Sequence, residues 1–191
     1  LWTIFIKTIK KLILKLSKTK FNGLVILERK SFNDSRGNFT EFFNEKLFNK
    51  LVDTKVDFLQ DNIVNSTKNV LRGLHYQFNP FAQSKLISVI KGEIFDVVVD
   101  IRNNSSTYGQ FFSINLSSEN NLSLFVPNGF AHGYLSLTSE TIVHYKVDNY
   151  YNKDFEDGIR YNDSFLNINW GVPIDDLIIS DKDKNLPDFK W

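Results

Sequence analysis

The sequence predicts a mainly β domain, built as a sandwich or barrel of short strands. From residue 24 onward, short apolar and aromatic runs follow one another, and turn residues such as Gly, Asn, Asp, Ser and Pro bound them. Short strands at roughly even spacing are typical of this fold class. The length of 191 residues suits one domain with appendages, and 18 phenylalanines supply much of the core volume.

Ten segments have the composition and alternation of strands. They cover residues 25–27, 38–43, 56–65, 71–76, 85–89, 93–101, 110–116, 122–126, 133–137 and 141–147. One internal helix is predicted over residues 41–52, where apolar side chains recur near helical spacing. After Asn152 the chain becomes rich in loops, and short helices are expected near Phe165 and Asp175.

The first twenty residues differ from the rest, because they mix apolar residues with six lysines and contain no acid. One interpretation is a basic amphipathic helix that rests on a membrane or a partner. The favoured alternative is an extension, partly helix and partly first strand, without a membrane role. A secretory signal is disfavoured, because lysines interrupt the apolar region and no small-residue cleavage site follows. We expect a basic amphipathic extension over residues 1–20 and a single domain over residues 21–191.

The bulk composition excludes several function classes. A net charge of +1 provides no basic field for nucleic acid. The lack of cysteine rules out disulfides and thiolate chemistry, which is compatible with a reducing compartment. No apolar run reaches the roughly 18 residues that span a bilayer.

The segment Leu71–Gln77, with the sequence LRGLHYQ, carries the strongest chemical signal. His75 can move a proton near neutral pH. It follows Arg72 by three residues, in a chain that has only five arginines. Arginine suits positions that need a planar, forked donor. The segment therefore predicts proton transfer beside an anion or a carbonyl oxygen.

Strand alternation selects a second candidate in residues 141–147. Tyr145 shares a face with Val143 and Val147, so it is expected to point into the domain. His144 shares the other face with Lys146 and is expected to point outward.

Further motifs follow in one order between about residues 24 and 187. They are Ser35-Arg36-Gly37, Gln60-Asp61-Asn62, Arg72–Gln77, Lys85-Leu86, Gly92–Arg102, Pro127–Gly133, Tyr145-Lys146, Asn149-Tyr150-Tyr151 and Trp170. Together they resemble the dTDP-4-dehydrorhamnose 3,5-epimerase family over most of the chain. The resemblance implies a cupin-type jelly-roll barrel with a few short helices, in a cytoplasmic homodimer.

The resemblance also implies a reaction. A dTDP-linked 4-keto-6-deoxyhexose is inverted at the carbons on both sides of its ketone, without cofactor or metal, to give dTDP-4-dehydro-L-rhamnose. Hydrogens beside a carbonyl are weakly acidic, so the site needs a base, an acid on the opposite face and donors at the oxygen. The resemblance assigns His75 as the base, Tyr145 as the acid and Asp183 as the carboxylate that orients His75. Asp181, two residues away, stays open as the alternative partner.

The remaining implied site residues contact the substrate. Arg72 and Lys85 are expected near the ketone oxygen and the diphosphate. A regular strand would aim Arg72 and His75 to opposite faces, and a bulge at Gly73 would resolve this conflict. Tyr151 is expected to stack on the thymine base. The other implied contacts are Arg36, Glu41, Gln60, Asn62, His132, Glu156 and Lys182.

Three alternatives remain. The enzyme could invert one carbon only, or act on another nucleotide-linked 4-keto sugar. It could be a cupin without activity, although both the base and the acid are present. A metal-dependent cupin is disfavoured, because His75-Tyr76-Gln77 lacks the second histidine of a His-X-His pair. His75 and His132 alone make too few ligands for a typical metal site.

Overall fold

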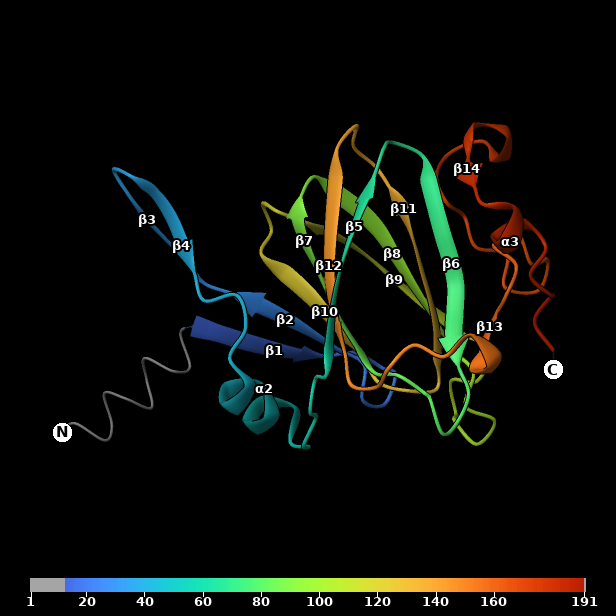
Figure 1. The fold of residues 1–191 in the computed structure, drawn as a ribbon, viewed down its shortest axis with the longest axis horizontal. Helices are drawn as coiled ribbons and strands as arrows, with labels where there is room; N and C mark the ends of the chain where they lie inside the picture. The colour runs from blue at the N-terminus through green and yellow to red at the C-terminus, as the bar shows by residue number, and fades with distance from the viewer. Residues whose placement is uncertain (1–12, 191) are drawn as a thin grey trace.

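The computed structural model describes residues 13–190 as two facing sheets with a hairpin, short helices and a C-terminal loop region around them (Figure 1). The first sheet has the order β1-β2-β10-β7-β12-β5, and the second has the order β13-β6-β11-β8-β9, with β14 beside β6. Neighbouring strands in both sheets are antiparallel, except that β14 runs parallel to β6. The predicted mainly β, jelly-roll fold is confirmed.

The strands of the first sheet are β1 (Leu14–Lys18), β2 (Val25–Arg29), β10 (Leu122–Val126), β7 (Lys85–Lys91), β12 (Thr141–Val147) and β5 (Gln60–Ser66). Those of the second are β13 (Glu156–Gly158), β6 (Val70–Gln77), β11 (Phe130–Ser136), β8 (Glu93–Asp100), β9 (Phe111–Ser117) and β14 (Ile178–Ile179). The separate hairpin consists of β3 (Ser31–Asp34) and β4 (Gly37–Thr40), and it projects from the body (Figure 1).

The predicted internal helix is present as α2 (Glu45–Val52), but it begins four residues late. Asn44 is its N-cap, with a side-chain oxygen that accepts from Leu47 N at 3.0 Å. The short helix expected near Asp175 is the 3₁₀ turn η2 (Ile174–Asp176). The prediction of a short helix near Phe165 is wrong. There the Asp163 carboxylate accepts the N–H groups of Phe165 and Leu166, which fixes a turn instead. The other short elements are η1 (Lys153–Phe155) and α3 (Asp181–Lys184).

The described part of the predicted extension is a strand. Residues 14–18 form β1, which pairs with β2 along its whole length, so this segment belongs to the sheet. The amphipathic pattern of residues 1–12 lies outside the described residues, and its role stays a prediction. None of the helices within residues 13–190 has both the length and the apolarity needed to cross a membrane.

Side chains from both sheets fill the interior between them. This core includes Ile87, Val98, Leu124 and Val143, all at most 1% exposed. The outer face of the second sheet packs under the C-terminal segment around Trp170, and the outer face of the first packs on α2 through aromatic contacts. Central strands such as β8, β10 and β11 are thus buried on both faces, which explains their near-continuous hydrophobic runs.

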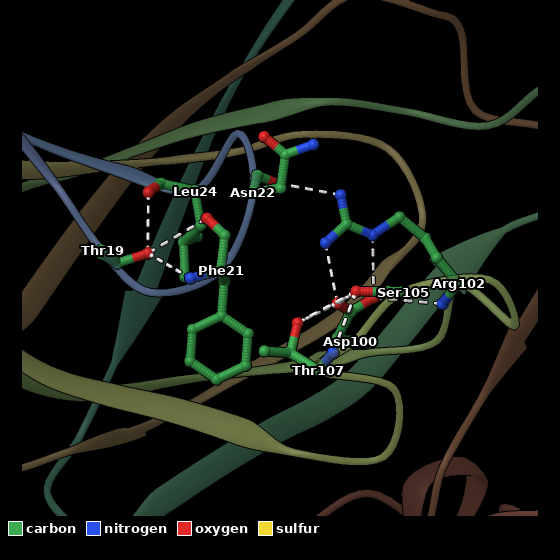
Figure 2. A network of polar contacts seen from close by, with 8 residues as sticks. All are labelled: Thr19, Phe21, Asn22, Leu24, Asp100, Arg102, Ser105 and Thr107. Carbon is green, nitrogen blue, oxygen red and sulfur yellow. Dashed lines mark hydrogen bonds and ion pairs between the residues drawn. The ribbon is translucent and has the colours of Figure 1, made fainter.

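A buried carboxylate ties two loops together at one end of the sandwich (Figure 2). Asp100 accepts from Arg102 Nε at 2.8 Å and from the hydroxyls of Ser105 and Thr107 at 2.6 Å each. Arg102 also donates to Asn22 O at 2.8 Å, in the turn that joins β1 to β2. Burial alone would raise the pKa of Asp100, but these bonds lower it to about 2.

The predicted bulge lies where β6 meets β11. His75 pairs with His132 and Arg72 with Tyr134, so two residues of β6 face the single Gly133 of β11. Gly73 has a φ of +112°, and a Cβ there would lie 2.6 Å from Gly133 Cα. Only glycine fits this position without strain. The extra residue brings Arg72 and His75 to the same side of the sheet.

Candidate active site

One cavity of about 520 Å³ between the two sheets holds most of the predicted site residues. From the second sheet, β6 contributes Arg72 and His75, and β11 contributes His132. From the first sheet, β12 contributes Tyr145 and β7 contributes Lys85. The two sheets thus present different chemical groups to a common space.

His75 is held by a buried carboxylate. Its Nε2 lies 2.7 Å from Asp183 Oδ1, and Asp183 is only 4% exposed. A carboxylate accepts only, so Nε2 carries the proton and Nδ1 is the free nitrogen. Asp183 Oδ2 accepts from Gly73 N at 3.1 Å. Burial would raise the pKa of Asp183, but the bonds from His75 and Gly73 bring it below its ordinary value.

The structure distinguishes the two candidate partners of His75. Ser180 caps α3 by accepting from Asp183 N at 3.1 Å, and this cap turns Asp183 inward. The side chain of Asp181 is 97% exposed and lies 3.6 Å from Lys184. Asp183 is therefore the residue that contacts His75.

Tyr145 points into the interior as its strand alternation predicts, since Val143 and Val147 on the same face are buried. Burial raises the pKa of its phenol, an effect that Arg72 opposes and Glu156 reinforces. The phenol therefore keeps its proton at neutral pH. His75 and Tyr145 line the cavity from opposing sheets, which is the arrangement that proton transfer at two faces of a ring requires.

Two cations border the same space. Burial lowers the pKa of Lys85 to about 8, against the opposing influence of Glu156 and Asp96. Its Nζ lies 3.5 Å from His75 O. Arg72 Nε donates to Ser66 Oγ at 3.2 Å and Nη2 donates to Asn65 O at 3.4 Å, and the remaining guanidinium N–H groups can bind a ligand. Both cations can stabilise negative charge on an oxygen in the cavity.

A second histidine–carboxylate pair lies beside the first. His132 Nε2 is 2.9 Å from Asp96 Oδ2, and both residues are buried. Asp96 was missed in the sequence because it lies in the apolar run of β8. A signal existed, since Asp96 shares its alternating face with the buried Ile94 and Val98.

The other predicted contacts within the cavity form small networks. Gln60 Nε2 donates to Asn62 Oδ1 at 2.8 Å, and both side chains face the cavity as their spacing predicts. At one end, Glu156 Oε2 accepts from Tyr151 Oη at 2.8 Å and from Lys182 Nζ at 2.5 Å. Burial would raise the pKa of Glu156, but these two donors lower it.

Two predicted contacts lie elsewhere. Arg36 is in the turn of the β3–β4 hairpin, with its side chain 87% exposed and paired with Asp34 at 2.6 Å. Glu41 follows the hairpin and accepts from Asn44 Nδ2 at 3.0 Å. Neither residue lines the cavity of its own chain. His144 is also outside it, on the outer sheet face, with Nε2 2.8 Å from Asp61 Oδ1.

Another cavity of about 520 Å³ lies near the C-terminal segment, lined by Tyr76, Arg102, Tyr108 and Phe189 among others. It contains no histidine, so it lacks a group for proton transfer near neutral pH. Within residues 13–190, no group of three or more His, Asp or Glu side chains gathers as metal ligands would. The cavity between the sheets is thus the candidate active site, suited to moving protons on a polar, anionic ligand.

Comparison with known proteins shows which family has a sequence similar to this chain. The family model described as dTDP-4-dehydrorhamnose 3,5-epimerase matches residues 18–190. A protein of that name from Shigella flexneri is 49% identical over 168 residues, which cover 88% of this chain and 92% of the relative.

Solved structures of epimerases are similar to this chain in both fold and sequence. The crystal structure of dTDP-4-dehydrorhamnose 3,5-epimerase from Elizabethkingia anophelis has a TM-score of 0.88 and 46% identity, covering 93% of this chain and 97% of the other. A dTDP-6-deoxy-D-glucose-3,5-epimerase from Legionella pneumophila, in complex with dTDP-4-keto-L-rhamnose, has a TM-score of 0.86 and 38% identity. That match covers 93% of this chain and 100% of the other.

Proposed function

Because the chain belongs to the dTDP-4-dehydrorhamnose 3,5-epimerase family and is an isomerase, we propose that it inverts C3 and C5 of dTDP-4-dehydro-6-deoxy-D-glucose. The product is dTDP-4-dehydro-L-rhamnose. The observation that carries this proposal is the placement of His75 and Tyr145 on opposing sheets around one cavity. The complex of the Legionella relative with dTDP-4-keto-L-rhamnose supports the choice of ligand.

The mechanism begins at His75. Its free Nδ1 takes the proton from the carbon beside the ketone, and the electrons of that C–H bond form the C=C bond of an enolate. The Asp183 carboxylate stabilises the resulting imidazolium, since Nε2 remains bonded to it at 2.7 Å. A positioned base of this kind contributes about 10²–10⁴-fold to the rate.

The enolate oxygen gathers negative charge that the cavity must stabilise. The ammonium of Lys85 and the free donors of Arg72 provide this, because both border the cavity with few competing partners. Tyr145 then donates its proton to the opposite face of the carbon and regains one from solvent. Its raised pKa keeps it in the donating form between turnovers. The His75 imidazolium releases the abstracted proton to solvent, and a second round of the same steps then inverts the other carbon.

Binding of the nucleotide uses the end of the cavity around Tyr151. Tyr151 is 55% exposed there and can stack on the thymine base, while Lys182 provides positive charge for the diphosphate. Gln60 and Asn62 offer amide groups along the wall. The cytoplasmic location that the resemblance implies stays a prediction.

We also infer a homodimer in which Arg36 acts on the cavity of the other copy. Arg36 and Glu41 lie outside the cavity of their own chain, on or next to a projecting hairpin (Figure 1). The hairpin exposes Phe39 at 68% and Phe32 at 44%, apolar surface that a second copy would cover. Mixing Arg36→Ala with His75→Ala should then restore activity in about a quarter of the sites, as expected for random dimers. No restoration, or a monomer by sedimentation equilibrium, contradicts the shared site.

The central test is solvent exchange. The protein is incubated with dTDP-4-keto-6-deoxyglucose in D₂O, and deuterium at each sugar carbon is followed by NMR and mass spectrometry. We expect label at both carbons next to the ketone. Label at one carbon only reassigns the protein as a mono-epimerase. No label from a panel of nucleotide-linked 4-keto sugars overturns the proposed function.

A further inference from the structure

The segment between β12 and β13 carries Tyr151 and crosses from the first sheet to the second (Figure 1). Its residues 148–152 belong to no helix or strand, and Tyr151 is 55% exposed. An irregular segment of this kind loses conformational entropy when one of its rings becomes fixed against a ligand. Contacts that already hold the backbone around Tyr151 lower this cost, so they bear directly on nucleotide affinity.

The side chain of Gln77 holds the backbone on both sides of Tyr151. Gln77 is the last residue of β6 and is 8% exposed. Its Nε2 donates to Tyr150 O at 3.2 Å and to Phe81 O at 2.7 Å. Its Oε1 accepts from Asn152 N at 2.7 Å. The residues before and after Tyr151 are thus bound to the same amide group.

The partners of this amide match the chemistry of glutamine. Two carbonyl oxygens lie beside Nε2, which has two hydrogens to donate, and one N–H lies beside Oε1, which accepts. Glutamate at position 77 would bring a second oxygen against the two carbonyls. An apolar side chain would remove all three hydrogen bonds from the backbone of the segment and of the neighbouring Phe81.

The backbone of Gln77 also determines where the far end of the Tyr151 side chain lies. In the pairing of β6 with β13, Gln77 lies opposite Glu156, whose Oε2 accepts from Tyr151 Oη at 2.8 Å. Gln77 follows the catalytic base His75 by two residues on β6, and both line the active-site cavity. One strand therefore carries the catalytic base and fixes the ring at the nucleotide end, which sets the distance between the two.

We propose that Gln77 is a positioning residue for nucleotide binding, which acts through Tyr151 by holding the backbone on both sides of its ring. This inference rests on the proposed function, in which Tyr151 stacks on the thymine base. The thymine base lies away from the reacting carbons, so the stack stabilises the bound substrate and the transition state equally. Loss of the Gln77 amide therefore raises KM and the dissociation constant of dTDP, and it leaves kcat little changed.

The test is a double-mutant cycle of Gln77→Met and Tyr151→Ala, in which isothermal titration calorimetry measures the dissociation constant of dTDP. Tyr151→Ala should raise this constant about 10- to 100-fold, as expected for the loss of one base–aromatic stack. Gln77→Met should raise it about 5- to 30-fold, the cost of ordering about one residue. The double variant should bind dTDP no more weakly than Tyr151→Ala, because the amide then has no ring to position.

The D₂O exchange assay provides a second measurement. With Gln77→Met, KM for the nucleotide sugar should rise in step with the dissociation constant of dTDP, and kcat should fall less than about threefold. Gln110→Met is the matched control and should change neither, because Gln110 is exposed outside the cavity and accepts from Lys20 Nζ at 2.8 Å. If the melting curve shows that Gln77→Met does not fold, Gln77→Asn replaces it in the cycle, since it keeps the amide but is shorter by one methylene.

The outcomes separate this inference from the function on which it rests. Additive losses in the cycle overturn the positioning role, and so does a fall in kcat as large as the rise in KM, which means that Gln77 acts on His75 through β6. Unchanged dTDP binding by Tyr151→Ala also overturns it, because the ring then does not contact the nucleotide. In each of these cases, exchange at both carbons by the wild-type protein leaves the proposed function intact. Failure of the wild-type protein with dTDP and with every nucleotide keto sugar removes both.

Discussion

Replacing Asp183 by asparagine tests the role of the carboxylate with a minimal change of shape. Asp183 accepts two hydrogen bonds, from His75 Nε2 at 2.7 Å and from Gly73 N at 3.1 Å. Asparagine has only one oxygen. If that oxygen keeps the bond to Gly73, the amide NH₂ group faces His75 Nε2. That nitrogen must then accept, and its proton moves to Nδ1, the nitrogen required as the base.

The alternative orientation is also unfavourable. If the asparagine oxygen faces His75, the NH₂ group faces Gly73 N, and a buried N–H loses its acceptor at a cost of about 1–3 kcal/mol. Either way the imidazolium loses the negative charge beside it. Comparable Asp→Asn changes in catalytic His–Asp pairs lower kcat about 10⁴-fold, and we expect about 10³- to 10⁴-fold here.

The assay is kcat for deuterium uptake by Asp183→Asn, with Asp181→Asn as the matched control. Asp181 lies on the same short helix, but its side chain is exposed and forms an ion pair with Lys184. Its variant should therefore change kcat less than about twofold. Retention of more than about a tenth of the activity in Asp183→Asn would refute the assignment of the carboxylate.

Three further predictions follow from the same geometry. Lys85→Met should lower kcat about 10²–10³-fold, and wild-type activity should decline as pH rises through about 8, where Lys85 loses its charge; a pH profile with no such limb speaks against its role. Gly73→Ala should destabilise the fold by about 2–4 kcal/mol in urea titrations, since its Cβ would lie 2.6 Å from Gly133 Cα at a φ of +112°. Asp100, with a folded-state pKa lowered to about 2, should contribute about 2 kcal/mol of stability above pH 4 that is lost as pH falls toward 2. Asp100→Asn should abolish that pH dependence, and an unchanged profile would place its origin elsewhere.

Local alternation accounts for the parts of the fold and site that were predictable. Tyr145 could be placed inward because Val143 and Val147 flank it at the strand period. Arg72 and His75 could share a face only with an irregularity between them, and Gly73 indicated where it lies. Alternation also predicts that Asp96, a lone acid in β8, points to the buried face. It was not selected as a site residue because it lies within an apolar run.

Other features depend on contacts between distant parts of the chain. Asp183 reaches His75 from 108 residues away, and nothing in the local sequence around α3 indicates that contact. β13 and β14 are too short to leave a periodic signal, and each forms only by pairing with β6. The turn at Phe165 replaced a predicted helix because one carboxylate, that of Asp163, captured the backbone N–H groups.

The most direct test of the two-sided proton transfer compares His75→Ala with Tyr145→Phe in D₂O. With His75→Ala, the substrate should take up no deuterium, because proton removal is lost. With Tyr145→Phe, the substrate should still take up deuterium at the carbons next to the ketone. That deuterium should be delivered largely to the face from which the proton was removed, so the inverted product is scarce. Equal uptake by His75→Ala and the wild-type protein, or full inversion by Tyr145→Phe, would contradict the account.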